Sequence, residues 1–136
     1  MKKSLVWFAT LSWAYFIFIL TTTPDLRVTN NTLLSLFLSY AGHIFFFGIQ
    51  ALLLRLSLTA NYSIIATSLY GFIIELVQTR VPTRSADPLD WALDTLGAIL
   101  VIYLINITKS HTLIRVLIRG KYSVLPSTIL IFLGIV

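Results

Sequence analysis

Apolar residues dominate four stretches of the sequence, and short polar segments separate these stretches. They cover about residues 5–21, 36–56, 62–77 and 89–107. A helix needs about 20 mostly apolar residues to cross roughly 30 Å of hydrocarbon. Each stretch approaches that length, with a composition that is rare in helices of soluble proteins. The pattern therefore predicts an all-α fold, a polytopic membrane helix bundle with four transmembrane helices.

The pattern changes after residue 107, where Arg115 and Arg119 lie one helical turn apart opposite an apolar side. This is typical of an amphipathic helix on a membrane surface, with its bases toward anionic lipid. The last stretch, 124–136, is apolar but reaches only about 20 Å as a helix, so it is either a half-buried helix or a fifth membrane segment. We divide the chain into a transmembrane domain, 1–107, and a basic amphipathic tail with a short hydrophobic end, 108–136.

The first apolar stretch also resembles a signal peptide, because Lys2 and Lys3 precede it. No small-x-small cleavage site follows, however, since the chain continues as Thr21-Thr22-Thr23-Pro24. We interpret the stretch as a retained membrane anchor.

Composition supports a membrane protein and indicates its orientation. Only 11% of the residues are charged and the mean hydropathy is +0.90, whereas soluble domains carry about 25% charged residues. An ordinary soluble enzyme and a disordered chain are thus excluded, and nucleic-acid binding is disfavoured despite a net charge of +5. Lys and Arg gather on the cytoplasmic side of membrane proteins, and seven of the ten lie on the side of the termini. We expect a multi-pass protein of the cytoplasmic membrane with both termini in the cytoplasm.

Polar side chains within or beside the apolar stretches collect toward the opposite, extracytoplasmic side. A charge at the centre of a membrane helix costs at least ~2.5 kcal/mol, so such a residue usually has a partner or a function. The candidate site residues are His43, Glu75, Gln78, Arg80, Arg84, Asp90 and Asp94. Helical spacing places Glu75 and Gln78 on one face, and Asp90 and Asp94 on another. Gly71 and Gly97 would let the helices approach closely, so we predict one outward-facing pocket rimmed by the two arginines.

Plainer roles compete for several of these residues. Asp87 before a proline is typical of a helix N-cap. Asp90 falls in the first helical turn, where a carboxylate also suits the helix dipole, so both roles stay open. His43 suits either a backbone hydrogen bond or a place in the site. We predict that Arg84 forms an ion pair with Glu75 or Asp90, because opposite charges at the edge of a low-dielectric layer are poorly hydrated and stabilise each other.

Three motifs lie beside these residues. Thr22-Thr23-Pro24 follows the first apolar stretch, and Gly42-His43 with Phe47-Gly48 lies in the second. The third and most specific motif is Glu75-x-x-Gln78, then Arg84-x-x-x-x-x-Asp90, then Asp94-x-x-Gly97. Over about residues 5–107 the chain thereby resembles the VanZ-like membrane proteins, the family of the teicoplanin-resistance protein VanZ. The family usually has asparagine at the position of Asp94.

The resemblance implies an integral protein of the cell envelope, in a family with members linked to low-level glycopeptide resistance. Resistance without chemistry on the drug fits a pocket that binds a lipid-linked cell-wall precursor or the lipid-tailed glycopeptide itself. The alternative is a membrane enzyme acting on a lipid-linked headgroup by acid/base or divalent-cation chemistry. Its catalytic candidates are His43, Glu75, Asp90 and Asp94.

A proton or ion pathway fits less well, because the inner halves of the last three spans offer almost no polar groups. The chain has no cysteine, so it lacks disulfides, thiolate nucleophiles and cysteine metal sites. We expect no bound metal and no cofactor, and we expect membrane lipids as partners.

Overall fold

The protein, seen in a computed structural model, is described over residues 3–24, 32–82 and 84–108. The regular structure within these ranges is entirely helical: α1 (Lys3–Thr22), α2 (Thr32–Arg55), α3 (Ala60–Gln78) and α4 (Pro88–Thr108). All four helices are long and apolar enough to cross a membrane. The prediction of an all-α membrane protein with four spanning helices is confirmed. The predicted amphipathic tail and short apolar end, 109–136, lie outside the described residues.

The chain divides into two units, Met1–Ile102 and Tyr103–Val136. The first unit holds α1, α2, α3 and α4 as far as Ile102, and with them every candidate site residue. Of the second unit, the described residues are the last turns of α4, where the Thr108 hydroxyl donates to the Leu104 carbonyl at 2.6 Å.

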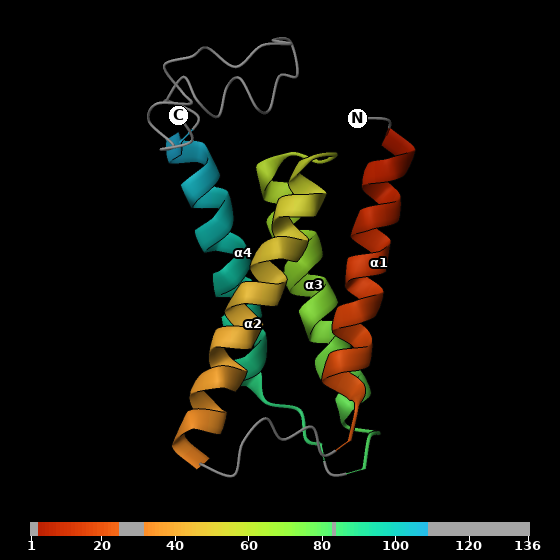
Figure 1. Ribbon diagram of the computed structural model, residues 1–136, viewed down its shortest axis with the longest axis vertical. Helices are drawn as coiled ribbons and strands as arrows, with labels where there is room; N and C mark the ends of the chain where they lie inside the picture. The colour runs from red at the N-terminus through yellow and green to blue at the C-terminus, as the bar shows by residue number, and fades with distance from the viewer. Residues whose placement is uncertain (1–2, 25–31, 83, 109–136) are drawn as a thin grey trace, which may run out of the picture. The chain divides into compact units, whose positions relative to one another are not determined.

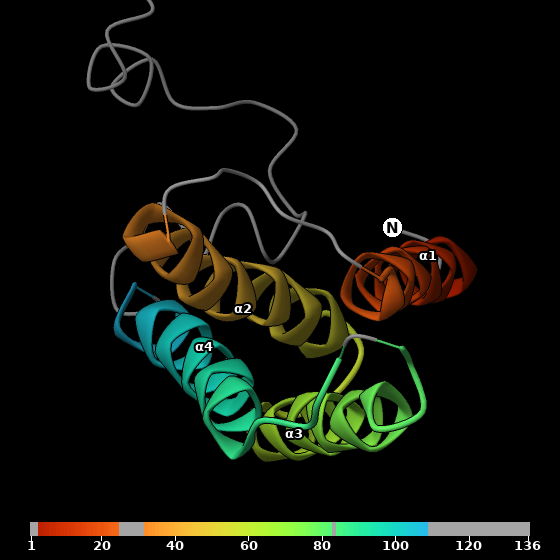
Figure 2. The ribbon, with the colours of Figure 1, turned by 90° about the horizontal axis from the view of Figure 1, so that it is seen from below.

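Successive helices of the first unit run in opposite directions (Figure 1). The C-terminal ends of α1 and α3 therefore lie at the same end as the N-terminal ends of α2 and α4. Figure 2 views the unit from this end, with α2 and α3 lying between α1 and α4. We call it the polar end, because it carries Thr21, Gln78, Arg84 and Asp90.

The observed helices begin and end within four residues of the predicted stretches. The largest difference is at α2, which starts at Thr32 rather than at 36, because serine and threonine lower the local hydropathy without preventing a helix. At the start of α4, the Leu89 N–H donates to Asp87 Oδ1 at 2.8 Å. This bond confirms the predicted N-cap, with Pro88 in the first helical position.

Glycine residues bring α4 against its neighbours. A Cβ on Gly97 would collide with the Ile44 carbonyl oxygen and lie 2.9 Å from the Ile44 Cα. A Cβ on Gly71 would lie 2.6 Å from Asp94 Oδ2. The predicted close approach of helices at Gly71 and Gly97 is confirmed, as expected for membrane helices that pack through small residues.

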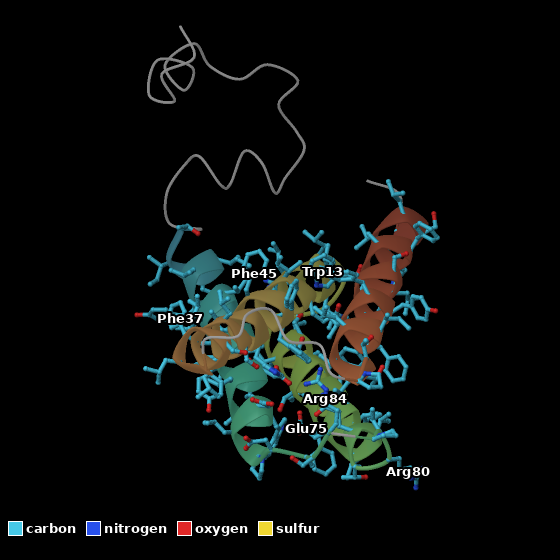
Figure 3. All side chains as sticks on the ribbon, turned by 60° about the horizontal axis from the view of Figure 1, so that its bottom comes forward. Trp13, Phe37, Phe45, Glu75, Arg80 and Arg84 are labelled. Atoms are coloured by element: carbon cyan, nitrogen blue, oxygen red, sulfur yellow. The ribbon has the colours of Figure 1, made fainter. Side chains whose placement is uncertain are left out.

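A small apolar core and a few interhelical hydrogen bonds hold the helices together. Ile17, Phe47 and Ile74 form the buried centre. The Trp13 indole N–H donates to the Phe46 carbonyl at 3.0 Å, which links α1 to α2. Large apolar side chains elsewhere are exposed, as Figure 3 shows for Phe37 and Phe45. This outer surface suits contact with lipid chains.

Candidate functional site

His43 of α2 lies between two aspartates of α4, and we call these three residues the Asp-His-Asp cluster (His43, Asp90, Asp94). His43 Nδ1 lies 2.8 Å from Asp94 Oδ1, a hydrogen bond in which the imidazole N–H donates to the carboxylate. His43 Nε2 lies 3.5 Å from Asp90 Oδ2. Because Asp90 and Asp94 are one turn apart, a single imidazole ring reaches both carboxylates. Asp90 thus combines its position in the first turn of α4 with a contact in the cluster.

The cluster depends on the close approach of α2, α3 and α4. Gly97 lies one turn after Asp94 and packs on Ile44, the neighbour of His43. Gly71 leaves room on α3 for the second carboxylate oxygen of Asp94. Asp94 is completely buried. The His43 ring is nearly parallel to the Phe47 ring, with an interplanar angle of 9°. A side chain at either glycine would push Asp94 away from His43.

Both ring nitrogens of His43 face carboxylates in this arrangement. A general base needs a nitrogen about 2.6–3.2 Å from the heavy atom that carries the proton it removes. Nδ1 is already bonded to Asp94, and Nε2 is directed to Asp90. The geometry therefore links α2 to α4. A carboxylate on Nδ1 is also how a catalytic imidazole is held, so Nε2, 3.5 Å from Asp90, is the nitrogen that could serve as a base. Within the described ranges, no group of three or more His, Cys, Asp or Glu residues has a geometry that could hold a metal ion.

Gln78 and Arg84 fasten the end of α1 to α3 and the loop that follows it. Gln78 Nε2 donates to the Thr21 carbonyl at 3.0 Å, and Arg84 Nη2 donates to the Thr23 carbonyl at 3.1 Å. Carbonyls at a helix C-terminus lack intrahelical partners and attract cationic donors. Both side chains therefore have a structural role that the sequence did not indicate.

The predicted ion pair of Arg84 with Glu75 or Asp90 is wrong. Arg84 bonds to a backbone carbonyl instead, and Glu75 Oε2 accepts the Asp87 N–H at 2.7 Å. Among the described residues, the only ion pairs are those of His43 with the two cluster aspartates. Glu75 thus fixes the loop before α4 through a backbone bond, because the Asp87 N–H lies closer to it than any cation.

Arg80 does not share the position of Arg84. Figure 3 shows Glu75 and Arg84 pointing inward among the helices, whereas Arg80 points away from them. Arg80 is exposed, and Arg84 is half-buried. Both arginines were expected at the rim of a pocket, but only Arg84 lines the cavity described next.

A cavity of about 410 Å³ lies between α1 and α2 at the polar end, and we call it the α1–α2 cavity. Its volume falls within the range of about 300–1,000 Å³ that is usual for small-ligand sites. One wall is apolar and includes Ile17, Leu20, Phe46 and Phe47. The polar residues that line it are Thr21, Ser35, Ser39, His43, Gln78 and Arg84.

The cavity and the predicted site overlap only in part. His43, Gln78 and Arg84 line the cavity, whereas Glu75, Arg80, Asp90 and Asp94 do not. Sequence reasoning missed Ser35, Ser39 and Gly42, which line it as well. These residues precede His43 by eight, four and one positions, so helical periodicity places them on the His43 side of α2. That spacing was the signal available in the sequence.

Comparison with known proteins adds no relative: no family model, no curated protein and no solved structure matches the chain.

Proposed function

We propose that this chain is a VanZ-like integral membrane protein of the cell envelope that binds an amphiphile in the α1–α2 cavity, without chemical turnover. The observation that carries the proposal is the two-part lining of the cavity, with an apolar wall that leads into a polar end. An amphiphile has the same two parts, a hydrocarbon chain and a polar headgroup. The proposed ligand is a lipid-linked cell-wall precursor or a lipid-tailed glycopeptide.

The position of the cavity suits a ligand that arrives from the bilayer. Leu36 and Leu38 line the cavity and are 47% and 38% exposed. Both lie in α2, on a surface of the kind that lipid chains would cover. A hydrocarbon chain would therefore enter beside them without crossing water, while its headgroup meets Ser39 and Arg84.

The lining of the cavity favours binding over catalysis. His43 is its one side chain suited to acid/base work, and both nitrogens of that ring face α4 carboxylates. Among the described residues that line the cavity there is no Asp or Glu. His43 is therefore the one acid/base side chain that these residues place beside the bound headgroup.

Binding is tested with the full chain in neutral detergent micelles, using a fluorescent lipid-linked cell-wall precursor and a lipid-tailed glycopeptide as separate probes. Gly42→Leu should weaken binding at least about tenfold, because the new side chain fills the cavity. A Cβ at Gly42 meets only the Phe46 side chain, at 3.7 Å, which is ordinary van der Waals contact, and equilibrium unfolding of the variant checks that the remaining side-chain atoms leave the fold intact.

Ala41→Leu is the matched control, because Ala41 is exposed and does not line the cavity. It should bind as the unmodified chain does. Saturable binding of neither probe, or equal binding by the Gly42→Leu and Ala41→Leu variants, would contradict the proposed function.

The proposal places the polar end on the extracytoplasmic side and both termini in the cytoplasm. Because the chain has no cysteine, single cysteines can report this orientation. Ala86→Cys should react with an impermeant thiol reagent in intact cells, since Ala86 is exposed in the loop at the polar end. Ser57→Cys, exposed in the turn between α2 and α3, should react only after the cells are opened. The reverse labelling pattern would place the cavity on the cytoplasmic side.

A further inference from the structure

We propose that the α1–α2 cavity selects amphiphiles with a phosphate-ester headgroup and that Arg84 is the residue that binds the phosphate. This inference rests on the proposed function and specifies the chemical class of the ligand. It favours the lipid-linked precursor, which carries phosphate, over the lipid-tailed glycopeptide.

The charges around the cavity carry the inference. Of the described residues that line it, Arg84 is the only cation that no carboxylate pairs, and none is acidic. An anionic headgroup placed there meets a guanidinium without meeting a carboxylate. A cationic headgroup would be repelled by the same guanidinium. The lining therefore favours anionic over cationic headgroups.

The neighbouring acids do not cancel this charge by pairing with Arg84. Asp90 and Asp94 face His43 across the α2–α4 contact, and Glu75 Oε2 accepts the Asp87 N–H. Arg84 forms no ion pair with any residue in the described part of the chain. The guanidinium therefore keeps its charge for a ligand.

Arg84 also has spare donors in a fixed position. Its Nη2 donates to the Thr23 carbonyl, which anchors the side chain, while its Nε is buried and has no hydrogen-bond partner among the described residues. A guanidinium carries five N–H donors in a planar fork that matches the oxygens of a phosphate. A buried donor without a partner is costly, and a phosphate oxygen would supply the missing acceptor.

Hydroxyl groups on α2 complete the polar lining. Ser35 and Ser39 are one turn apart and both line the cavity that Arg84 lines. Serine hydroxyls donate to phosphate oxygens without adding charge. Since the apolar wall adjoins these groups, tight binding requires a ligand with both a hydrocarbon chain and a phosphate, and free phosphate alone should bind weakly.

The experiment measures displacement of a fluorescent isoprenyl phosphate from the full chain in neutral detergent micelles. The competitors are farnesyl phosphate, farnesol and inorganic phosphate. Farnesyl phosphate should bind at least about tenfold more tightly than farnesol, as expected for charge-assisted hydrogen bonds. Inorganic phosphate should not displace the probe. If inorganic phosphate displaces the probe as effectively as farnesyl phosphate does, the cavity is a site for free anions and the inference is overturned.

The variants assign the preference to a residue. Arg84→Gln should lose the preference for farnesyl phosphate over farnesol, and equilibrium unfolding at the denaturant concentration of the unmodified chain shows that the variant is folded. Arg84→Lys keeps the charge and should retain part of the preference. Arg80→Gln is the matched control, because Arg80 is exposed, points away from the helices and does not line the cavity. Equal loss of preference in Arg80→Gln and Arg84→Gln would overturn the assignment to Arg84.

The unmodified chain separates the two levels of the proposal without any variant. Equal binding of farnesyl phosphate and farnesol would overturn the phosphate inference and leave amphiphile binding in place. Binding of neither ligand, together with no binding of the lipid-linked precursor, would overturn the proposed function as well.

Discussion

Gly97→Ala should destabilise the four-helix unit more than alanine at Gly42 or Gly48. The added Cβ would collide with the Ile44 carbonyl oxygen and lie 2.9 Å from the Ile44 Cα, and backbone atoms cannot rotate away as a side chain can. α4 must therefore move away from α2, which also lengthens the hydrogen bond between His43 and Asp94. We expect a loss of about 1–3 kcal/mol from the overpacking alone, measured by equilibrium unfolding in mixed detergent micelles.

Gly42 and Gly48 provide graded controls for this prediction. At Gly42 a Cβ lies 3.7 Å from the flexible end of Phe46, so Gly42→Ala should be nearly neutral. At Gly48 it lies 2.9 Å from Val101 Cγ2, a side-chain atom that can shift, so an intermediate loss is expected. If Gly97→Ala and Gly42→Ala unfold at the same denaturant concentration, the close contact of α2 and α4 is contradicted.

Asp94→Ala should cost about 1–3 kcal/mol of stability, because it removes the acceptor of the buried His43 N–H. Asp94 is completely buried and holds His43 Nδ1 at 2.8 Å. Asp94→Asn should differ from the unmodified chain by no more than about 1 kcal/mol, since the amide oxygen still accepts the imidazole N–H. It also introduces the residue that the resemblance to VanZ-like proteins leads us to expect.

The same substitutions separate a binding protein from an enzyme. Asp94→Asn should retain ligand binding, whereas an enzyme that needs this carboxylate would lose its activity. Stability changes in His43→Ala, Asp94→Ala and the double variant should be non-additive, as expected for residues in direct contact. An Asp94→Ala variant as stable as the unmodified chain would show that the Asp-His-Asp cluster does not link α2 to α4.

The helices were predictable because hydropathy is a local property, and each membrane span contains its own apolar residues. The convergence of His43 with Asp90 and Asp94 was also accessible, since helical spacing puts both aspartates on one face and their depth matches that of His43. The partner of Arg84 was not accessible. It is the backbone carbonyl of Thr23, and the position of a carbonyl depends on the path of the chain rather than on a side chain.

The α1–α2 cavity was only partly predictable from the sequence. Ser35, Ser39 and Gly42 recur with the spacing of one helical face. In an apolar helix, however, small uncharged residues usually mark helix packing. Only the distance between α1 and α2 in the folded unit shows that this face borders a cavity. The sequence therefore pointed to His43 and Arg84 as polar groups but not to the space that they share.

Photolabelling tests the central claim, amphiphile binding in the α1–α2 cavity, most directly. The unmodified full chain is irradiated with an isoprenyl phosphate that carries a diazirine on its chain, and the adducts are mapped by mass spectrometry. We expect adducts on Leu20 and Phe46, which line the cavity, and we expect excess unlabelled isoprenyl phosphate to suppress them. Adducts of similar yield on the exposed α4 residues Leu96 and Ile99, with no suppression by competitor anywhere, would contradict the account.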